Sequence, residues 1–249
     1  MKTPDSGNKF TINDVINSIG DGWIMFWEIP GVSIAYTSIF ALIGLILLAG
    51  IGMMGLSPMA LPFAGGFMLI GPILLSGFFQ IADHYNDDKK SVRLSDAVLA
   101  LKQAPAQLWV ISLVCTMLFM VWITDAATLY SIMISDTQTP WTIQIESNVI
   151  AYELWGSLMG SVLAFIIFAI SAFSVPLLYQ ARTNLVGAVT LSVKTVFGNF
   201  ISSMFWGVLL SVLTIISIII LPLFIITLPV LAFASYSLYK RIFPMADNI

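Results

Sequence analysis

The sequence predicts an all-α membrane protein with six transmembrane helices, and three observations support this fold class. Hydrophobic residues make up 59% of the 249 positions and charged residues only 9%, whereas roughly a quarter of the residues of a soluble domain are charged. Long runs of the chain contain no Asp, Glu, Lys or Arg. The basic residues fall between those runs, in a pattern that a fixed membrane orientation explains.

The uncharged runs fit six crossings of the bilayer, because one helix needs about 20 residues to cross the hydrocarbon. The run 29–82 is long enough for two helices and contains prolines near its middle. The run 195–239 also fits two helices, with a bend at Leu221–Pro222, while 103–124 and 154–181 fit one each. The expected transmembrane helices are 33–54, 60–82, 107–129, 150–179, 199–220 and 223–241.

Six crossings place both ends of the chain on the same side of the membrane. All ten Lys and Arg residues then lie on that side, including the four in the longest polar interruption, Ala82–Pro105. The opposite side holds acidic residues only, namely Asp125, Asp136, Glu146 and Glu153. Cytoplasmic loops of membrane proteins are enriched in Lys and Arg, so the basic side and both termini are predicted to be cytoplasmic.

A short amphipathic helix is expected before the first span. Thr11 and Asp14 have the spacing of a capping box, in which two side chains satisfy backbone N–H groups at the start of a helix. Trp23 and Trp27 would lie at the level of the lipid headgroups, and Pro30 would end the helix. The apolar residues at helical spacing are Ile12, Val15, Ile16, Ile19, Trp23 and Phe26.

The same design recurs twice along the chain. Within Ala82–Pro105, Ser95 is the expected N-cap of a helix that Pro105 ends. The segment 184–198 repeats the pattern and carries Val186, Val189, Val193 and Phe197 on one face. A proline followed by aliphatic residues also marks the second span of each unit, at Pro72, Pro176 and Pro229.

We therefore expect one membrane domain over residues 1–249, with a polar tail at 1–10. Three repeats of an interfacial helix and a two-helix hairpin would occupy 11–82, 83–179 and 180–243. Because each unit contains two spans, every unit enters the membrane from the same side. Such repeats are parallel and are related by an axis along the membrane normal.

Several short segments resemble a family of bacterial predicted integral membrane proteins of unknown function. They are Trp27-x-x-Pro30-Gly31, Gly65-Gly66-Phe67 leading to Gly71-Pro72, Ser95-Asp96-Ala97, and Tyr236 to Arg241. The resemblance implies a multi-pass protein of the bacterial inner membrane. Some family members are labelled cytochrome c oxidase subunit I, which would imply residence beside a respiratory oxidase.

The residues themselves argue against that label in its literal sense. A haem–copper subunit places several histidines on its haem groups and copper, whereas this chain has one histidine, His84. Its one cysteine, Cys115, excludes an internal disulfide and a cysteine-based metal cluster. We expect neither a cofactor nor a bound metal.

Two groups of ionisable residues are candidate sites. His84 and Asp83, close to Asp87 and Asp88, could bind a cation or relay protons at the cytoplasmic surface. A histidine among solvated carboxylates at a helix end is, however, more often part of a polar loop.

Asp125 and Glu153 lie near the outer ends of consecutive spans and could hold a proton or cation between them. Both are also close enough to the membrane surface to be hydrated. Glu28, just before Pro30, has the same two interpretations at the inner surface.

Small residues on one predicted helix indicate close helix packing. Gly156 and Gly160 form a GxxxG motif, and Ser157 and Ser161 lie beside them. Such residues allow two helix backbones to approach closely in a membrane. We interpret them as a contact within the protein or with a partner subunit.

The chain lacks the motifs of the common enzymes and of nucleic-acid binding. We expect a non-catalytic protein in contact with membrane lipids and other subunits. It would be an accessory subunit or assembly and stability factor of a larger membrane complex, such as a respiratory terminal oxidase. The alternative is a small transporter or lipid-handling protein, in which Ser76, Gln80, Ser171 and Ser174 would line a polar cavity.

Overall fold

The computed structural model describes residues 7–53, 71–87, 92–133 and 147–244. Every regular element in these ranges is a helix, which confirms the predicted all-α class. The helices are α1 (Ile12–Glu28), α2 (Pro30–Met53), α4 (Pro72–Asp87), α5 (Leu94–Gln103), α6 (Ala106–Met133), α7 (Ser147–Ser171), α8 (Ser174–Tyr179), α9 (Leu185–Gly198), α10 (Phe200–Ile219) and α11 (Leu221–Ile242).

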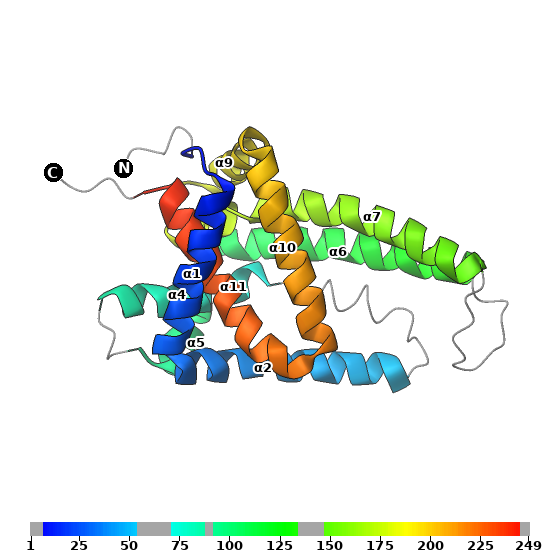
Figure 1. Cartoon of the computed structure of the whole chain (residues 1–249), viewed down its shortest axis with the longest axis horizontal. Helices are drawn as coiled ribbons and strands as arrows, with labels where there is room; N and C mark the ends of the chain where they lie inside the picture. The colour runs from blue at the N-terminus through cyan, green and yellow to red at the C-terminus, as the bar shows by residue number, and fades with distance from the viewer. Residues whose placement is uncertain (1–6, 54–70, 88–91, 134–146, 245–249) are drawn as a thin grey trace.

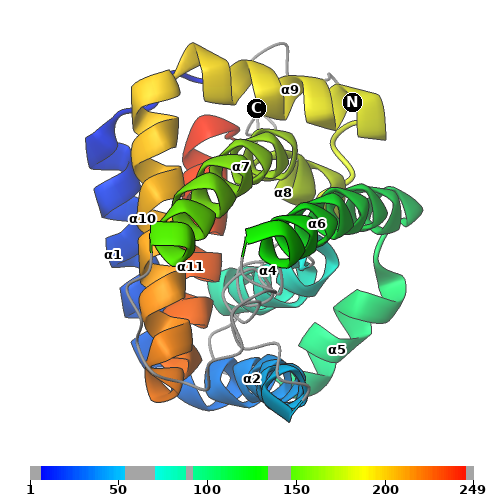
Figure 2. The ribbon, with the colours of Figure 1, turned by 90° about the vertical axis from the view of Figure 1, so that its right-hand side faces the viewer.

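The long helices run in two main directions. In Figure 1, α2, α6 and α7 follow the long axis of the molecule, while α1, α10 and α11 run across it. The perpendicular view shows α1, α10 and α11 on one side and α9 across the top (Figure 2). The change of direction begins at Ile29, where α1 and α2 are bent by 102° relative to each other.

Several helices are suited to a bilayer. Among the described residues, the segments long and apolar enough to cross a membrane are Ala106–Ile132, Leu154–Tyr179, Phe200–Ser217 and Pro222–Ile242. The bent pair α1 and α2 qualifies as a fifth if its two helices count as one span. The expected helix 33–54 corresponds to α2. The expected helix 60–82 lies partly outside the described residues, and its second half coincides with α4.

The three segments predicted as short helices are α1, α5 and α9. The Thr11–Asp14 capping box is present, because Thr11 N–H donates to Asp14 Oδ2 over 2.7 Å and Asp14 N–H donates to Thr11 Oγ1. These bonds from Thr11 lower the pKa of Asp14. The cap therefore stabilises the helix fully when the pH is above the ordinary carboxyl pKa. This stabilisation is lost as the pH falls through the lowered pKa of Asp14 in the folded protein.

The starts of the other two short helices differ from what the sequence suggested. The N-cap of α9 is Asn184, which was not identified from the sequence, and its side chain accepts a bond from the Gly187 N–H at 2.8 Å. Ser95 is not the N-cap of α5, because the cap is Arg93 and Ser95 lies inside the helix. The side chain of Asp96 stabilises the start of this helix by accepting a 3.0 Å hydrogen bond from the Arg93 backbone N–H.

The face of α1 that packs on the protein differs from the apolar face identified in the sequence. Val15 and Phe26 are buried as expected, but Ser18 and Gly22 complete the buried face, while Trp23 remains half exposed. A Cβ added at Gly22 would lie 2.5 Å from the Val230 carbonyl oxygen of α11. Small residues thus bring the two backbones together. Hydropathy spacing alone missed this contact, since Gly and Ser are not apolar anchors.

Helix α11 forms the centre of the fold and contacts α1, α2, α4 and α10. Its second half is almost completely buried, including Phe233, Tyr236 and Tyr239. The ring of Tyr236 stacks on Phe79 of α4, with ring centroids 4.7 Å apart. Because aromatic side chains bury large areas, these contacts anchor α11 between the other helices.

The prolines proposed as marks of the repeat occupy different positions. Pro72 begins α4, Pro176 lies in the short helix α8, and Pro229 is inside α11. The break before α8 is stabilised by Ser192 of α9, whose hydroxyl donates to the Ala169 carbonyl at 2.8 Å. The three-unit repeat remains a prediction.

The contact between α1 and α11 can be tested with two glycines of the same helix. Gly22→Ala should lower the melting temperature in detergent, because overpacking of a close helix contact costs about 1–3 kcal/mol. Gly20→Ala is the matched control, since a Cβ there meets nothing within 4 Å. It gains helix propensity at no steric cost. Equal effects of the two substitutions would contradict the close approach.

Candidate functional site: a polar network and cavity at the charged end

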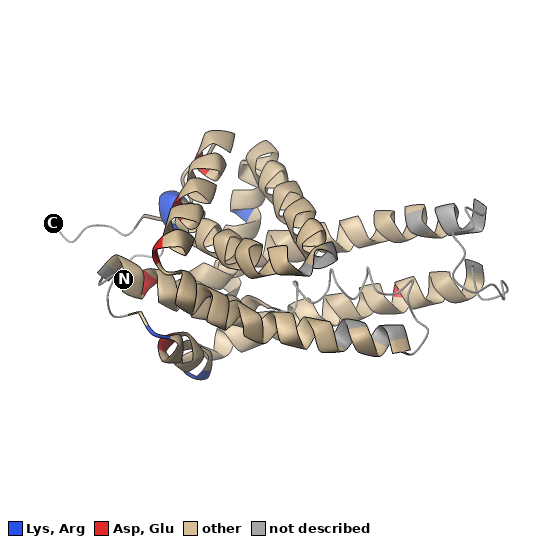
Figure 3. Ribbon diagram, turned by 60° about the horizontal axis from the view of Figure 1, so that its bottom comes forward, with Lys and Arg blue, Asp and Glu red and all other residues tan. Residues whose placement is uncertain are grey.

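Most charged side chains gather at one end of the molecule (Figure 3). The two ends of the described chain meet there, since the Asn8 N–H donates to the Ile242 carbonyl at 2.9 Å. Lys194, Lys240 and Arg241 lie on the helices α9 and α11 that reach this end. Most ionisable groups are therefore concentrated in one region, whereas Asp125 and Glu153 lie on α6 and α7.

Asp83 of α4 is the centre of a hydrogen-bond network in this region. Its carboxylate accepts bonds from the Tyr236 hydroxyl at 2.8 Å and the Tyr179 hydroxyl at 3.2 Å. It also pairs with Lys240 Nζ at 2.8 Å. Hydrogen bonds to a charged acceptor are stronger than neutral ones. One carboxylate thus holds α4, α8 and α11 together.

The spacing of the participating residues explains how each helix contributes several groups. Tyr236 and Lys240 are four residues apart on α11, and residues at this spacing lie on the same helix face. Gln80 and Asp83 are three residues apart on α4, so both reach Tyr179, whose hydroxyl lies 2.8 Å from Gln80 Oε1. Lys240 Nζ also lies 4.5 Å above the Tyr236 ring, a cation–π arrangement.

The network continues to the end of α11 through Gln180 and Arg182. Gln180 Nε2 donates to the Tyr236 hydroxyl at 2.7 Å, and Gln180 Oε1 accepts from Tyr239 at 2.8 Å. Arg182 donates to the Tyr239 hydroxyl and to the carbonyls of Phe243 and Pro244. Ala181, with φ 50°, turns the chain after α8 so that Arg182 can reach these groups.

In the opposite direction the network reaches the histidine. His84 Nε2 lies 3.2 Å from Gln80 Nε2. Its Nδ1 is 3.4 Å from Asp96 Oδ2, close enough for an ion pair when the ring is protonated. The angle is outside hydrogen-bond geometry, so Nδ1 has no hydrogen-bond partner in the described residues.

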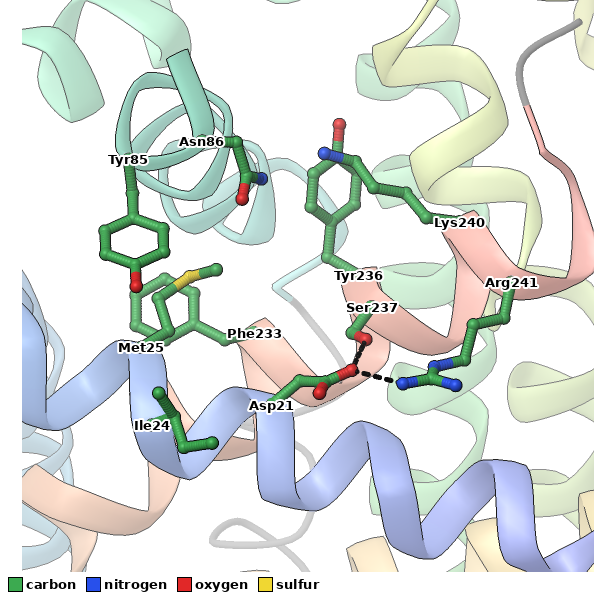
Figure 4. Close-up of a pocket in the computed structure, with 10 residues that line it drawn as sticks. All are labelled: Asp21, Ile24, Met25, Tyr85, Asn86, Phe233, Tyr236, Ser237, Lys240 and Arg241. Carbon is green, nitrogen blue, oxygen red and sulfur yellow. Dashed lines mark hydrogen bonds and ion pairs between the residues drawn. The ribbon is translucent and has the colours of Figure 1, made fainter. Parts of the chain in front are cut away.

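A cavity of about 460 Å³ lies beside the network, between α1, α4 and α11. Figure 4 shows the residues that line it. They are Asp21, Ile24, Met25, Tyr85, Asn86, Phe233, Tyr236, Ser237, Lys240 and Arg241. The lining is amphipathic, with charged groups from α1 and α11 and apolar or aromatic groups deeper in the cavity.

Asp21 connects α1 to the end of α11 at this cavity. Its Oδ2 accepts a 2.8 Å bond from Arg241 Nη2 and a second bond from the Ser237 hydroxyl. Partial burial tends to raise the pKa of Asp21, but these two bonds and the Arg241 charge outweigh it, so the pKa is lowered. Asp21 therefore remains ionised at neutral pH.

The structure brings together only part of the predicted ionisable site around His84. Asp83 and His84 belong to the network, although Asp83 binds hydroxyls and an ammonium group rather than pairing with His84. The side chain of Asp87 and all of Asp88 lie outside the described residues. Among the described residues no three His, Cys, Asp or Glu side chains come together to hold a metal ion.

Asp125 is partly buried on α6, about 28 Å along the helix from Ala106 at 1.5 Å per residue. Glu153 is on α7, but its side chain lies outside the described residues, so the proposed pairing of these two carboxylates stays a prediction. Glu28 is the exposed last residue of α1, before the bend at Ile29.

Of the two glycines in the GxxxG motif of α7, only Gly160 is in a close helix contact within the described residues. A Cβ at Gly160 would meet the indole of Trp122 at 2.7 Å, so this glycine allows α6 and α7 to pack. Gly156 has open space around it, and Ser157 and Ser161 are exposed. Gly160 thus serves a contact within the protein, whereas a partner contact at the other three residues remains a prediction.

Sequence reasoning missed Tyr179, Gln180, Arg182, Tyr236 and Asp21. The spacing of Tyr236, Tyr239 and Lys240 was a usable signal, since polar groups on one face of an apolar helix require partners. Tyr236 and Lys240 bond to Asp83, about 150 positions away, and Tyr239 bonds to Gln180, so no local pattern identifies these partners. The residues expected around a transport cavity, Ser76, Gln80, Ser171 and Ser174, do not line the cavity found here.

Comparison with known proteins supports the membrane assignment. Residues 60–180 match the model of a family described as "Predicted integral membrane protein (DUF2189)". The match confirms the resemblance to a family of predicted integral membrane proteins, and it includes α4, α5, α6, α7 and α8. No curated protein and no solved structure matches the chain significantly.

The central role of Asp83 can be tested by removing its charge without changing its shape. Asp83→Asn should lower the stability in detergent by roughly 1–2 kcal/mol, because the bonds from Tyr236 and Lys240 lose their charged acceptor. Asp125→Asn is the control, since no described residue bonds to Asp125. A melting temperature unaffected by Asp83→Asn would show that the network does not hold the helices together.

Proposed function

We propose that the chain is a non-catalytic multi-pass membrane protein, an accessory subunit or assembly factor that packs against a larger membrane complex. The observation that carries this proposal is the hairpin of α6 and α7, which projects beyond the other described helices (Figure 1). Its buried residues Phe119, Ala126 and Tyr152 are not part of the main core. The hairpin therefore offers helix surfaces at a distance from the body of the protein.

The exposed side chains of the hairpin are apolar on both helices. Met117 on α6 is 63% exposed and Leu158 on α7 is 55% exposed, counting the protein alone. Such side chains require lipid or other helices around them. Close contacts between membrane helices depend on small residues, and Gly156, Ser157 and Ser161 lie on this exposed helix. A partner helix docked beside them fits the accessory-subunit proposal.

We also propose the full topology of six spans in three repeats, with both termini on the cytoplasmic side of a bacterial inner membrane. The 102° bend at Ile29 supports an interfacial α1 followed by a span at α2, because that arrangement requires a near right angle. Helices α10 and α11 run in the direction of α1 (Figure 1), so the fifth and sixth spans rest on the length and hydropathy of those helices alone. The bond between Asn8 and Ile242 supports termini on the same side. The concentration of basic residues there favours the cytoplasm.

A lipid-handling function is the second candidate, and the amphipathic cavity beside Asp21 favours it. Solute transport receives less support from the same cavity. The cavity opens at the charged end, and two of the serines expected to line a transport cavity, Ser76 and Ser174, are buried elsewhere in the protein.

The accessory-subunit proposal is tested by purifying the tagged full-length protein from its native membrane in mild detergent and identifying partners by mass spectrometry. We expect stoichiometric recovery of other membrane subunits, with a respiratory oxidase as the first complex to examine. Leu158→Trp should reduce that recovery severalfold, because the larger side chain keeps the helix apolar but blocks close packing.

The matched control is Val212→Trp, an equally apolar change at an exposed position of α10. It should leave the recovery unchanged. Isolation of the chain alone, as a monomer or homo-oligomer, would overturn the accessory-subunit proposal and favour lipid handling.

A further inference from the structure

The cavity between α1, α4 and α11 lies where a membrane surface would meet the protein. Trp23 and Trp27 are half exposed on another face of α1, and tryptophan favours the headgroup region of a bilayer, so α1 is suited to that level. Ile24, also on α1, lines the cavity and is 57% exposed. The cavity is therefore continuous with apolar surface that lipid chains can cover.

The two halves of the cavity have different chemistry. Met25, Tyr85 and Phe233 provide apolar and aromatic walls, and Phe233 is fully buried (Figure 4). Asp21, Ser237 and Arg241 lie at the opposite side, joined by the bonds to Asp21 Oδ2. A ligand that fills this space needs an apolar part and a polar part close together.

The charged groups have bonding capacity that the protein does not use. A guanidinium carries five N–H groups and an ammonium three. In the described residues, Arg241 bonds only to Asp21, and Lys240 only to Asp83. Asp21 accepts both of its bonds on Oδ2, which leaves Oδ1 as a vacant acceptor.

The charges at the cavity are balanced. Lys240 is neutralised by Asp83 and Arg241 by Asp21, each pair at 2.8 Å. A ligand with a net charge would have to compete with one of these pairs. A ligand that carries both charges can instead place its anion on the unused N–H groups and its cation on the free carboxylate oxygen.

We propose that this cavity binds the headgroup of a zwitterionic phospholipid of the phosphoethanolamine type. Its phosphate accepts hydrogen bonds from Arg241 and Lys240, and its ammonium group donates to Asp21 Oδ1. The glycerol and upper acyl chains extend past Ile24 and Met25 to the membrane. This site is independent of the accessory-subunit proposal, because a bound lipid can also stabilise a structural subunit.

The proposal is tested by native mass spectrometry of the delipidated full-length protein in detergent. Phosphatidylethanolamine, phosphatidylglycerol and diacylglycerol with identical acyl chains are added separately. Binding should be strongest for phosphatidylethanolamine, weaker for phosphatidylglycerol, which lacks the ammonium group, and weakest for diacylglycerol, which lacks both charges. Equal binding of all three would overturn the proposal, since acyl chains alone would then explain it.

Two variants locate the site. Arg241→Gln should weaken phosphatidylethanolamine binding about tenfold, the effect of losing one charge-assisted contact. Lys194→Gln is the control, because Lys194 is an exposed cation on α9 at the same end but does not line the cavity. A similar effect of both variants would overturn the proposal, because it would indicate general attraction to a basic surface.

A variant of Asp21 and a competition with inorganic phosphate test which part of the headgroup is recognised. Asp21→Asn should remove most of the preference for phosphatidylethanolamine over phosphatidylglycerol, and an unchanged preference would contradict the role of Asp21. Millimolar inorganic phosphate should not displace the lipid. Displacement would overturn the proposal in favour of a free phosphate site. The wild-type lipid comparison remains decisive if a variant does not fold.

Discussion

The bonds to the Asp83 carboxylate are the interaction on which the charged end of the protein depends. A bilayer provides no water for charged groups, so such groups must lie near its surface or be paired. Asp83 is partly buried between helices that are otherwise apolar, and Lys240 with two tyrosines satisfies it. The same contacts fix the end of α11, the helix that packs against α1, α2, α4 and α10.

The cavity follows from this arrangement. Lys240 is turned toward Asp83 and Arg241 toward Asp21, so the two adjacent cations of α11 bond to α4 and α1 respectively. Between these two connections the helices cannot close completely. The resulting space has charged groups at its edge and Phe233 at its base, which is the chemistry of a phospholipid near its glycerol. Structural stabilisation and lipid binding can thus use the same residues.

Much of the fold was predictable because the bilayer imposes simple constraints. Uncharged runs predicted α2, α6, α7, α10 and α11 to within several residues, and the Thr11–Asp14 capping box was recognised from local spacing. The α1 contact was not predicted, because Gly22 and Ser18 act through their small size and hydropathy gives them no weight. Ser95 was preferred over Arg93 as a cap on residue type alone, although Asp96 closes that helix start.

The candidate site was only partly predictable. Asp83 and His84 were singled out as the ionisable groups of the central polar segment, but their partners come from α8, α5 and α11. Such contacts depend on how distant helices pack, which one sequence does not specify. The exposed α6–α7 hairpin has a similar origin, since each helix alone is an ordinary apolar span. Only the arrangement in space shows that they project together.

The orientation of the charged end is the central claim, and cysteine accessibility in intact cells tests it most directly. In a Cys115→Ser background, Lys194→Cys on α9 and Thr137→Cys, between the predicted spans 107–129 and 150–179, are treated with a membrane-impermeant maleimide. We predict labelling of Thr137→Cys in intact cells and of Lys194→Cys only after the membrane is permeabilised. Labelling of Lys194→Cys in intact cells, with Thr137→Cys protected until permeabilisation, would contradict a cytoplasmic location for the network and its cavity.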